Sequence, residues 1–325
     1  MTKTNIRKRA ISILLILMVM LTMTPMTASA ASGDGTEGNP LVVTTYEDWK
    51  AAMQQSGETY IKLGGDIDTS KMNGGYGLGT DEWIRVQTDI HLDLNGHKLT
   101  LLKSKLTSSD PSYLILVLKG SLTIEDSRSG GEIVGLHQVT KQSMQLIDVM
   151  EGAKLTLNSG KLHLAVSADT HTPNATIRFS GMVQINGGTV SIARESVYEE
   201  ASPYVIRQNF ALEANRRNPK CHAVIKGGTF DGRVLLYAVA KASGTADNVI
   251  TGGDFKKSIF IRKDKNVTAA PITIRRGIAS IHLLTLFRER RRVTPIIACN
   301  SLQMDLHPRK IGMTFNTMST FIMER

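Results

Sequence analysis

Short segments with nearly the same pattern recur along the middle of this chain. Each alternates apolar and polar residues over the length of one short strand, and each then ends in a polar residue or a glycine turn. The copies occupy residues 90–97, 120–126, 152–160, 182–190 and 223–230, with a shorter sixth copy at 249–255. Alternation with a period of two indicates strands, and a unit that recurs along the chain indicates a solenoid.

The spacing of the copies favours a solenoid over a sandwich of hairpins. Equivalent apolar residues follow one another in steps of 30, 33, 28, 40 and 25 residues, namely Leu94, Ile124, Leu157, Ile185, Ile225 and Ile250. A sandwich of hairpins would need turn signals about every 8–12 residues. A step of this size instead suits one coil of several strands, so the weaker alternating runs at 114–118 and 162–166 are predicted to form its other sides. The fold class expected is all-β.

The glycine pairs that end several copies are predicted to be the corners of the coil. Gly187-Gly188-Thr189 and Gly227-Gly228-Thr229 each follow a strand pattern directly. Glycine adopts a positive φ at little steric cost, and tight corners need that conformation. Stacking the coils would place successive strands about 4.8 Å apart, so Leu, Ile and Val in register would form continuous interior rows.

Repeats of this kind resemble the right-handed parallel β-helix, or pectate-lyase-like, repeats of secreted and surface proteins from Gram-positive bacteria. The resemblance rests on residues 92–100, on 122–127 followed by Gly130-Gly131-Glu132-Ile133, and on the Ile-x-Gly-Gly-x-Phe copies, and it covers residues 60–260. It implies a right-handed parallel β-helix. It names no single chemistry, because the fold carries lyases, glycosidases, adhesins and binding proteins alike.

The start of the chain has the features of an export signal. Four basic residues lie within the first nine positions, residues 10–23 form an apolar stretch, and residues 28–30 are Ala-Ser-Ala. This apolar stretch is shorter than the roughly 20 residues of a membrane span. We therefore expect cleavage after Ala30, a secreted or cell-surface location, and no transmembrane anchor in the mature chain.

Three segments are expected after the signal. Residues 31–44 are predicted to be a polar linker, residues 45–275 the β-helix domain, and residues 276–325 a basic tail that is poorly ordered or atypical. The domain opens with a short helix at 45–55, with Thr45 as the N-cap and with Trp49, Ala52 and Met53 on one face. We expect this helix to cap the open end of the solenoid, because exposed strand edges and apolar rows favour aggregation.

Charge is unevenly distributed along the chain. The net charge of +10 comes from residues 1–30 and 262–325, and residues 31–261 hold 23 basic against 25 acidic side chains. A nearly neutral domain does not predict a nucleic-acid partner. For the basic tail three explanations stay open: a C-terminal cap, an extension that contacts an anionic envelope, or a stretch left by an out-of-frame or truncated reading.

The candidate chemical residues lie on or beside the strand copies. Alternation predicts that His91, Asp93 and Asn95 face outward, with Glu125 in a comparable position on the next copy. Asp93 and Glu125 are the candidate catalytic carboxylates of a glycosidase, and such a pair could also hold calcium for a lyase. Trp83 and Tyr113 join His91 and Asn95 as candidate ligand-binding residues, because aromatic rings stack on sugars.

Other reactive groups give weaker signals. Asp126 lies in an acidic turn, where it either binds calcium or forms a structural corner. Calcium is the one cofactor that the sequence suggests. Cys221 and Cys299 have no framework spacing, so unpaired thiols are expected.

Two classes of function follow from these features. The first is a non-catalytic, adhesin-like scaffold that binds an extracellular polysaccharide or another cell-envelope component. The second is a polysaccharide lyase or glycoside hydrolase on the same scaffold, for which the insertion at 194–221 would supply a wall. Polar residues on a half-exposed strand are also explained as the solvated side of the pleat.

Overall fold

The computed structural model describes residues 31–79, 83–103, 113–137, 143–166, 174–193, 209–215, 221–238 and 248–263, and the backbone of six further strands after these; side chains beyond 260 are not described. The predicted signal at 1–30 lies outside the described residues. Most of the predicted insertion at 194–221 also lies outside them.

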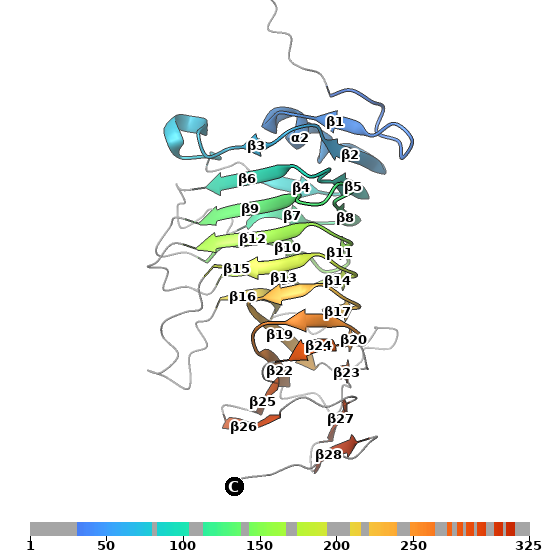
Figure 1. The fold of residues 1–325 in the computed structure, drawn as a ribbon, viewed down its shortest axis with the longest axis vertical. Coiled ribbons are helices and arrows are strands. Elements are labelled where there is room, and N and C mark those ends of the chain that lie inside the picture. Colours follow the sequence, from blue (N-terminus) through green and yellow to red (C-terminus); the bar gives the residue numbers. More distant parts are fainter. Residues whose placement is uncertain are drawn as a thin grey trace, which may run out of the picture. The chain divides into compact units, whose positions relative to one another are not determined.

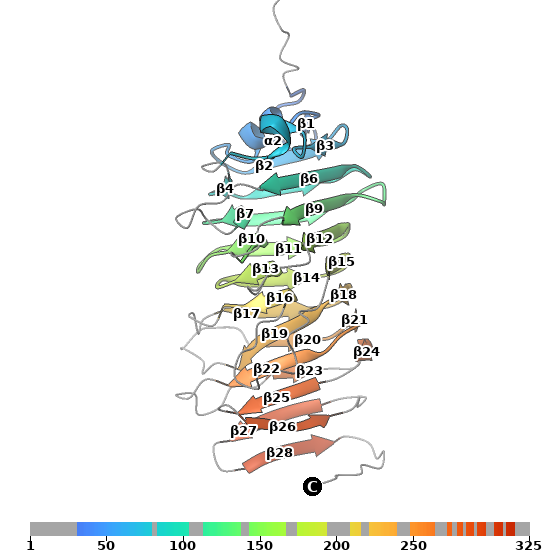
Figure 2. The same cartoon turned by 90° about the vertical axis from the view of Figure 1, so that its left-hand side faces the viewer.

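Among the described residues, three sheets account for nearly all of the regular structure (Figures 1 and 2). Sheet I contains β1 (Leu41–Val43), β2 (Thr59–Leu63), β5 (Ile90–Asp93), β8 (Ser121–Glu125), β11 (Lys154–Leu157), β14 (Met182–Ile185), β17 (His222–Ile225), β20 (Asn248–Ile250), β23 (Ile272–Ile274), β27 (Leu302–His307) and β28 (Lys310–Phe315). Sheet II contains β3 (Ile67–Asp68), β6 (Lys98–Lys103), β9 (Glu132–His137), β12 (Lys161–Val166), β15 (Thr189–Ile192), β18 (Thr229–Asp231), β21 (Gly253–Phe255) and β24 (Ile278–Ile281). Sheet III contains β4 (Ile84–Val86), β7 (Tyr113–Val117), β10 (Gln145–Val149), β13 (Ala175–Phe179), β16 (Phe210–Ala214), β19 (Arg233–Ala238), β22 (Ile259–Lys263), β25 (Leu284–Arg288) and β26 (Arg291–Ile296).

The chain visits the three sheets in a fixed order. Strands β5, β6 and β7 lie in sheets I, II and III, and the next three strands repeat that order one layer further along. Each strand from β2 to β22 pairs in parallel with its counterparts in the neighbouring coils, as for β8 with β5 and β11. This arrangement is a parallel β-solenoid, and the all-β fold class is confirmed.

The register between coils agrees with the repeat copies, with one correction. Leu157 pairs with Ile124 and with Ile185, and Ile185 pairs with Ile225, as the spacing predicted. Leu92, however, is the partner of Ile124 in place of Leu94. The strand β5 ends at Asp93, so Leu94 belongs to the turn that follows it.

Apolar side chains fill the space inside the coils. The rows of sheet I that contain Ile124 and Leu122 are fully buried, and the sequence produces them because every second residue of each strand points inward. In sheet II two interior residues are aromatic: the rings of Phe230 and Phe255 stack with their centroids 4.8 Å apart. Continuous interior contacts of this kind hold each coil to its neighbours.

The glycine pairs form corners as predicted. Gly188 has a φ of 77°, and Gly228 has a φ of 88°. A Cβ on Gly188 would lie 2.6 Å from the carbonyl oxygen of Gly160 in the neighbouring coil. Conformation and close approach therefore both require glycine at this corner.

The predicted helix is present as α2 (Tyr46–Ala52), which is shorter than the predicted range. Its N-cap Thr45 accepts a hydrogen bond from the Asp48 N–H at 3.1 Å. Trp49, Ala52 and Met53 are buried, and α2 contacts β1 and β2. A 3-10 turn follows at Met72–Gly75. Closure of the solenoid end by α2 stays a prediction.

Strands also occur in the two segments that flank the predicted domain. β1 lies within the range 31–44 and pairs in parallel with β2. In the range 276–325, β24 and β25 continue the parallel pairing, whereas β26, β27 and β28 pair antiparallel with their neighbours. The segment 31–44 forms a strand at β1, where Leu41, Val42 and Val43 are three consecutive apolar residues.

The connections between sheets differ in length. Three residues separate β11 from β12, whereas eight separate β12 from β13. Three residues separate β14 from β15, and seventeen separate β15 from β16. In these two coils the longer connection is the one from sheet II to sheet III, and binding sites commonly lie beside such insertions.

Candidate functional site

The outer face of sheet I carries the polar side chains that the sequence aligned. Thr123 lies beside His91 on one side and beside Thr156 on the other, and Gln184 follows Thr156 in the same row. The connections that enter this sheet from sheet III vary in length: two residues separate β13 from β14, and seven separate β16 from β17. Sheet I presents a polar row from His91 to Gln184, and Val224 on β17 follows Gln184 in that row.

An aromatic pair lies near the first coil of this face. The rings of Tyr60 and His91 stack with centroids 4.2 Å apart and an angle of 4° between the planes. Oε1 of Glu58 contacts both residues: it lies 3.1 Å from His91 Nε2 and accepts a hydrogen bond from the Tyr60 hydroxyl at 3.4 Å. Partial burial, and next the charge of Glu58, raise the pKa of Tyr60 above its ordinary value. The sequence identified His91 as a ligand candidate and missed Tyr60.

A second row of this face consists of amides. Asn186 donates from Nδ2 to Oδ1 of Asn158 at 2.8 Å, and Gln184 donates from Nε2 to Oδ1 of Asn186 at 3.0 Å. Both asparagines are exposed. Each amide in such a row keeps hydrogen-bonding capacity directed at solvent, because the asparagine side chain has more donors and acceptors than these bonds use.

The predicted carboxylate pair is adjacent, but Asp93 is occupied. Asp93 and Glu125 are register partners on β5 and β8. Oδ1 of Asp93 accepts from the N–H groups of Asn95 and Ser127, and Oδ2 accepts from the Ser127 hydroxyl at 2.7 Å and lies 3.1 Å from Lys62 Nζ. Burial opposes ionisation, yet the Ser127 and Lys62 contacts hold the pKa of Asp93 below its ordinary value. A general acid needs the opposite shift.

Two further candidates have structural contacts in the turns. Asn95 was expected to face outward, but it is 8% exposed and donates from Nδ2 to the Leu63 carbonyl at 2.9 Å. The alternation fails there because the strand has already ended. Asp126 accepts from the N–H groups of Gly96 and Gly131, one on each carboxylate oxygen, at 2.7 Å. These are the contacts of a structural corner.

The aromatic candidates Trp83 and Tyr113 lie together, but next to sheet III. Their rings meet edge to face with centroids 6.4 Å apart, and the guanidinium of Arg85 lies 4.6 Å from the Trp83 ring centroid. Burial, with Asp148 adding to it, raises the pKa of Tyr113 although Arg85 opposes the shift. The sequence-predicted ligand residues are thus divided between two sheets and the turns.

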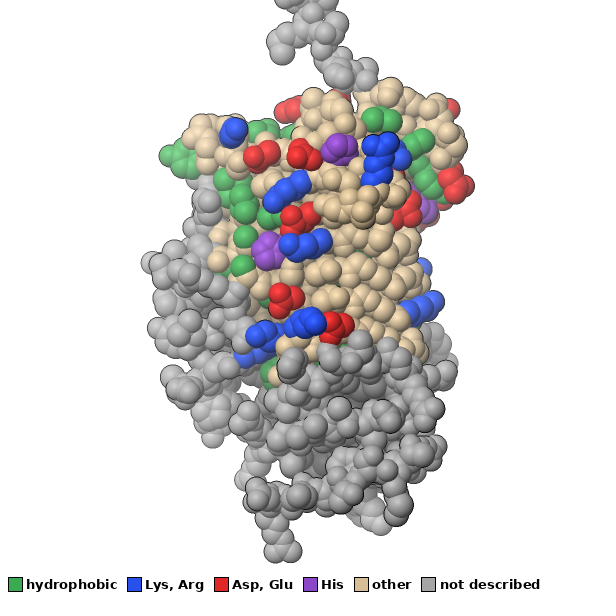
Figure 3. Space-filling model, in the orientation of Figure 1, with side chains coloured by type: hydrophobic (Ala, Val, Ile, Leu, Met, Phe, Trp, Pro, Cys, Tyr) green, Lys and Arg blue, Asp and Glu red, His purple; other side chains and the backbone are tan. Residues whose placement is uncertain are grey.

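The outer face of sheet II carries charges of alternating sign, which Figure 3 shows as a band of blue and red side chains. Glu132 lies between two lysines of the neighbouring coils, 2.7 Å from Lys161 Nζ and 3.4 Å from Lys98 Nζ. Partial burial would raise the pKa of Glu132, but the two ammonium groups hold it below its ordinary value. This row ties three coils together and fixes the direction of Lys161.

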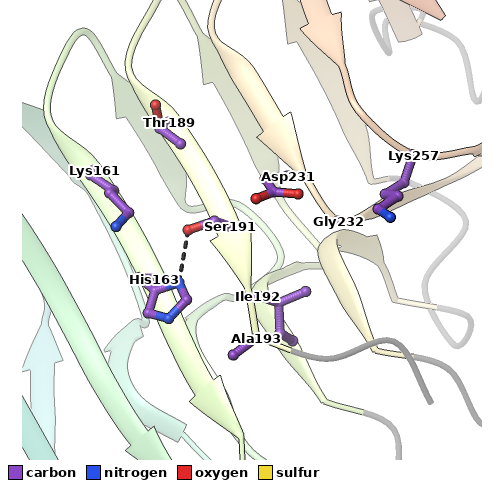
Figure 4. A pocket seen from close by; sticks show the side chains of 9 residues that line it. All are labelled: Lys161, His163, Thr189, Ser191, Ile192, Ala193, Asp231, Gly232 and Lys257. Carbon is purple, nitrogen blue, oxygen red and sulfur yellow. Dashed lines mark hydrogen bonds between the residues drawn. The ribbon is translucent and has the colours of Figure 1, made fainter. Parts of the chain in front are cut away.

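Beside this row, the outer face of sheet II is hollowed across β12, β15 and β18 (Figure 4). The hollow has a volume of about 460 Å³, within the usual range of small-ligand sites. It is lined by Lys161, His163, Thr189, Ser191, Ile192, Ala193, Asp231, Gly232 and Lys257. The seventeen-residue connection to β16 starts at Ala193.

A histidine and a serine meet inside this hollow. Nδ1 of His163 lies 2.8 Å from Oγ of Ser191, with the register placing Asp231 on the far side of Ser191. Burial, and next the charge of Lys161, hold the pKa of His163 below its ordinary value of 6.5. The imidazole is therefore neutral at pH 7, and it can accept a proton.

Sequence reasoning did not identify this hollow, although a signal was present. Aligning the copies on Gly160, Gly188 and Gly228 puts His163, Ser191 and Asp231 at the same position of three successive coils. His163 has no nucleophile beside it in the sequence. The two side chains are 28 residues apart and become neighbours only through the register of β12 with β15.

Metal, membrane and thiol features are limited in the described part of the chain. No group of three or more His, Cys, Asp or Glu side chains there could hold a metal ion. Calcium at Asp126 stays a prediction.

No helix of the described segments has the length and apolar character needed to span a membrane. Cys221 is buried and unpaired, and burial raises the pKa of its thiol to about 11; Cys299 lies outside these segments.

The described residues form a parallel β-solenoid with polar side chains on the outer faces of sheets I and II and a hollow on sheet II. Comparison with protein-family models, with curated proteins and with solved structures found no match for this chain.

The two lowered carboxyl pKa values predict a loss of stability in acid. Ionised Asp93 and Glu132 stabilise the fold above about pH 4.5, and this contribution disappears as the pH falls through their lowered pKa values. We expect about 1 kcal/mol from each, since both are partly exposed to solvent. Urea unfolding between pH 7 and pH 3 measures it. The double variant Asp93→Asn with Glu132→Gln should lose less stability over this interval, and an unchanged pH dependence would contradict the assignment.

Proposed function

We propose that this protein is a secreted or cell-surface β-solenoid whose sheet I face binds an extracellular polysaccharide or another cell-envelope component without cleaving it. The observation that carries the proposal is the outer face of sheet I, where a stacked ring pair lies beside a row of hydroxyl and amide groups that spans three coils. Successive coils repeat about every 4.8 Å, so such rows suit a long ligand with many hydroxyl groups.

The ring pair and the amide row supply the two kinds of contact that sugars use. Tyr60 and His91 offer an aromatic surface on which a sugar ring packs, and Asn158 and Asn186 offer directional hydrogen bonds. Residues 31–261 hold 23 basic against 25 acidic side chains, and a domain this close to neutral favours a neutral glycan over nucleic acid. The right-handed winding and the likeness to pectate-lyase-like surface proteins belong to this proposal too, supported by the repeat copies.

Export supports the same function. The basic and apolar pattern of residues 1–30 is that of a cleaved signal, and a glycan of the cell envelope would be met outside the cell. The alternative class, a polysaccharide lyase or glycoside hydrolase, would need a free acid and base. The four contacts to Asp93 do not favour that role for the pair Asp93 and Glu125.

Binding to a glycan array tests the proposal. The full exported chain should retain at least one polysaccharide, and the pair of substitutions Tyr60→Ala and His91→Ala should weaken its affinity by about tenfold or more, which is 1.4 kcal/mol. Asn158→Ala with Asn186→Ala should act in the same direction. Lys98→Gln on sheet II is the matched control and should leave the affinity unchanged.

Two outcomes would count against the proposal. If the chain retains no glycan, or if the sheet I variants bind as the parent does, the face is not the binding surface. Reducing-sugar and unsaturated-product assays on any retained glycan distinguish binding from cleavage. Release of shortened chains would favour the lyase or glycosidase class.

A further inference from the structure

The hollow on sheet II brings together groups that the binding function of sheet I does not use. His163 and Ser191 form its centre, on β12 and β15, and their hydrogen bond is drawn in Figure 4. Asp231 lies on β18 beyond Ser191, and Lys161 and Lys257 are the cations of the lining. A row of salt bridges would account for the charged side chains here. It would not account for a serine hydroxyl that is hydrogen-bonded to an imidazole within a hollow.

The serine is held in a fixed position. Ser191 is 5% exposed, and its carbonyl accepts a hydrogen bond from the hydroxyl of the buried Thr176 at 2.7 Å. Its own Oγ contacts His163 Nδ1 at 2.8 Å and the Leu162 carbonyl at 3.4 Å. A hydroxyl within hydrogen-bond reach of a neutral imidazole is the arrangement by which proteins activate serine as a nucleophile.

We propose that Ser191 and His163 are a nucleophile and its general base, and that the hollow hydrolyses small acyl esters. Oγ of Ser191 attacks the ester carbonyl carbon while its proton passes to Nδ1 of His163. The carbon–oxygen bond to the alcohol then breaks, and His163 returns the proton to the departing oxygen. Water then gives a proton to the same imidazole and attacks the acyl carbon; the bond from that carbon to Oγ breaks, the acid leaves, and His163 returns the proton to Oγ of Ser191.

The lining suits an ester of this class. Ile192 and Ala193 provide an apolar side for the acyl group, while Lys161 and Lys257 contribute positive charge to the lining, which favours an oxygen that becomes negative in the reaction. Glu132 holds Lys161 at 2.7 Å and so limits its movement. If the protein binds glycans as proposed above, an O-acyl substituent on a sugar hydroxyl is the substrate; that identification rests on the proposed function, whereas the ester chemistry does not.

Labelling with a serine-reactive fluorophosphonate probe tests the nucleophile in the full chain. We expect one modified residue, located at Ser191 by mass spectrometry of the parent protein, so the result does not depend on any variant folding. Ser191→Ala should abolish the labelling. Ser121→Ala is the matched control, because Ser121 bonds Asp89 on sheet I at 2.7 Å and lies outside the hollow.

Hydrolysis of 4-nitrophenyl acetate tests the base. His163→Gln should lower kcat/KM by about 100-fold or more. His97→Gln, which removes a histidine that contacts Asp66 elsewhere, should leave the rate unchanged. Circular dichroism shows whether each variant is folded.

The pH profile gives a readout that a purely structural role would not move. The charged groups that act on His163 are Lys161 on its own strand, Glu132 and Lys98 on the preceding coils, and Asp231 on β18. The rate of ester hydrolysis should be independent of pH near pH 7 and should fall in acid, with a midpoint below pH 6.5. Absent labelling of folded parent protein, labelling elsewhere, or full activity of Ser191→Ala would overturn the proposal. Since glycan binding is measured separately, either function can fail alone.

Discussion

Replacing Phe230 with alanine should lower the free energy of unfolding by about 3–5 kcal/mol, because a large buried ring is removed from a tightly packed interior. Phe230 and Phe255 are both fully buried, and their rings lie parallel with centroids 4.8 Å apart. The variant also leaves Phe255 without its stacking partner. Loss of this contact weakens the join between two coils, which in a solenoid share contacts only with their neighbours.

Urea unfolding followed by circular dichroism measures the effect of Phe230→Ala. Tyr76→Ala is the control, because Tyr76 is 47% exposed and the removal of an exposed ring should cost little. Phe230 lies directly before Asp231, so the same variant should also disturb the hollow on sheet II. A change below about 1 kcal/mol would mean that this ring pair does not carry the interior packing assigned to it.

Replacing Gly188 with alanine should destabilise the fold by about 2–5 kcal/mol. A positive φ costs a residue with a Cβ about 1–2 kcal/mol, and forced overpacking costs about 1–3 kcal/mol. Both terms apply, since the φ of Gly188 is 77° and its Cβ would lie 2.6 Å from the Gly160 carbonyl oxygen. The clash is with the backbone of the neighbouring coil, which has little freedom to move.

The matched control for Gly188→Ala is Gly65→Ala. Gly65 has no positive φ, and a Cβ built there meets nothing within 4 Å. The control should change the unfolding midpoint in urea by only a small amount. Equal effects of the two variants would contradict the corner assignment, whereas a large effect at Gly188 alone supports it.

If both the glycan-binding face and the ester-hydrolysing hollow are confirmed, the solenoid carries two functions on two sheets. Sheet I would hold a long ligand along its flat polar face, and sheet II would act on a substituent at one place beside an insertion. In the coil of the hollow, three residues connect sheet I to sheet II and seventeen connect sheet II to sheet III. Each function has its own variants, so one does not stand or fall with the other.

Much of the fold could be predicted because the signals are local. The alternation around Leu122 and Leu155 marks strands, and Gly188 marks a corner, from a few adjacent residues each. The helix at Tyr46–Ala52 follows from Thr45 and the apolar face behind it. The alignment was wrong at Leu94 because the strand β5 ends at Asp93, before the alternating pattern ends. Residue propensities alone do not locate such a strand end.

The candidate site was harder to predict because its residues meet across coils. The carboxylate of Asp93 looked chemical in the sequence, yet the contacts with Ser127 and Lys62 give it a structural role. His163 looked isolated, yet it lies 2.8 Å from Ser191.

The sequence by itself determined the repeating strand, the apolar interior rows and the glycine corners, because each depends on residues that are close together in the chain. Only the tertiary structure decided which outward side chains become neighbours, such as Glu132 with Lys98 and Lys161, or His163 with Ser191. The physical reason is that these side chains lie about one coil apart in the chain and meet only when the coils stack: the repeat copies indicate the register of the strands, whereas the contacts across that register depend on the folded coils.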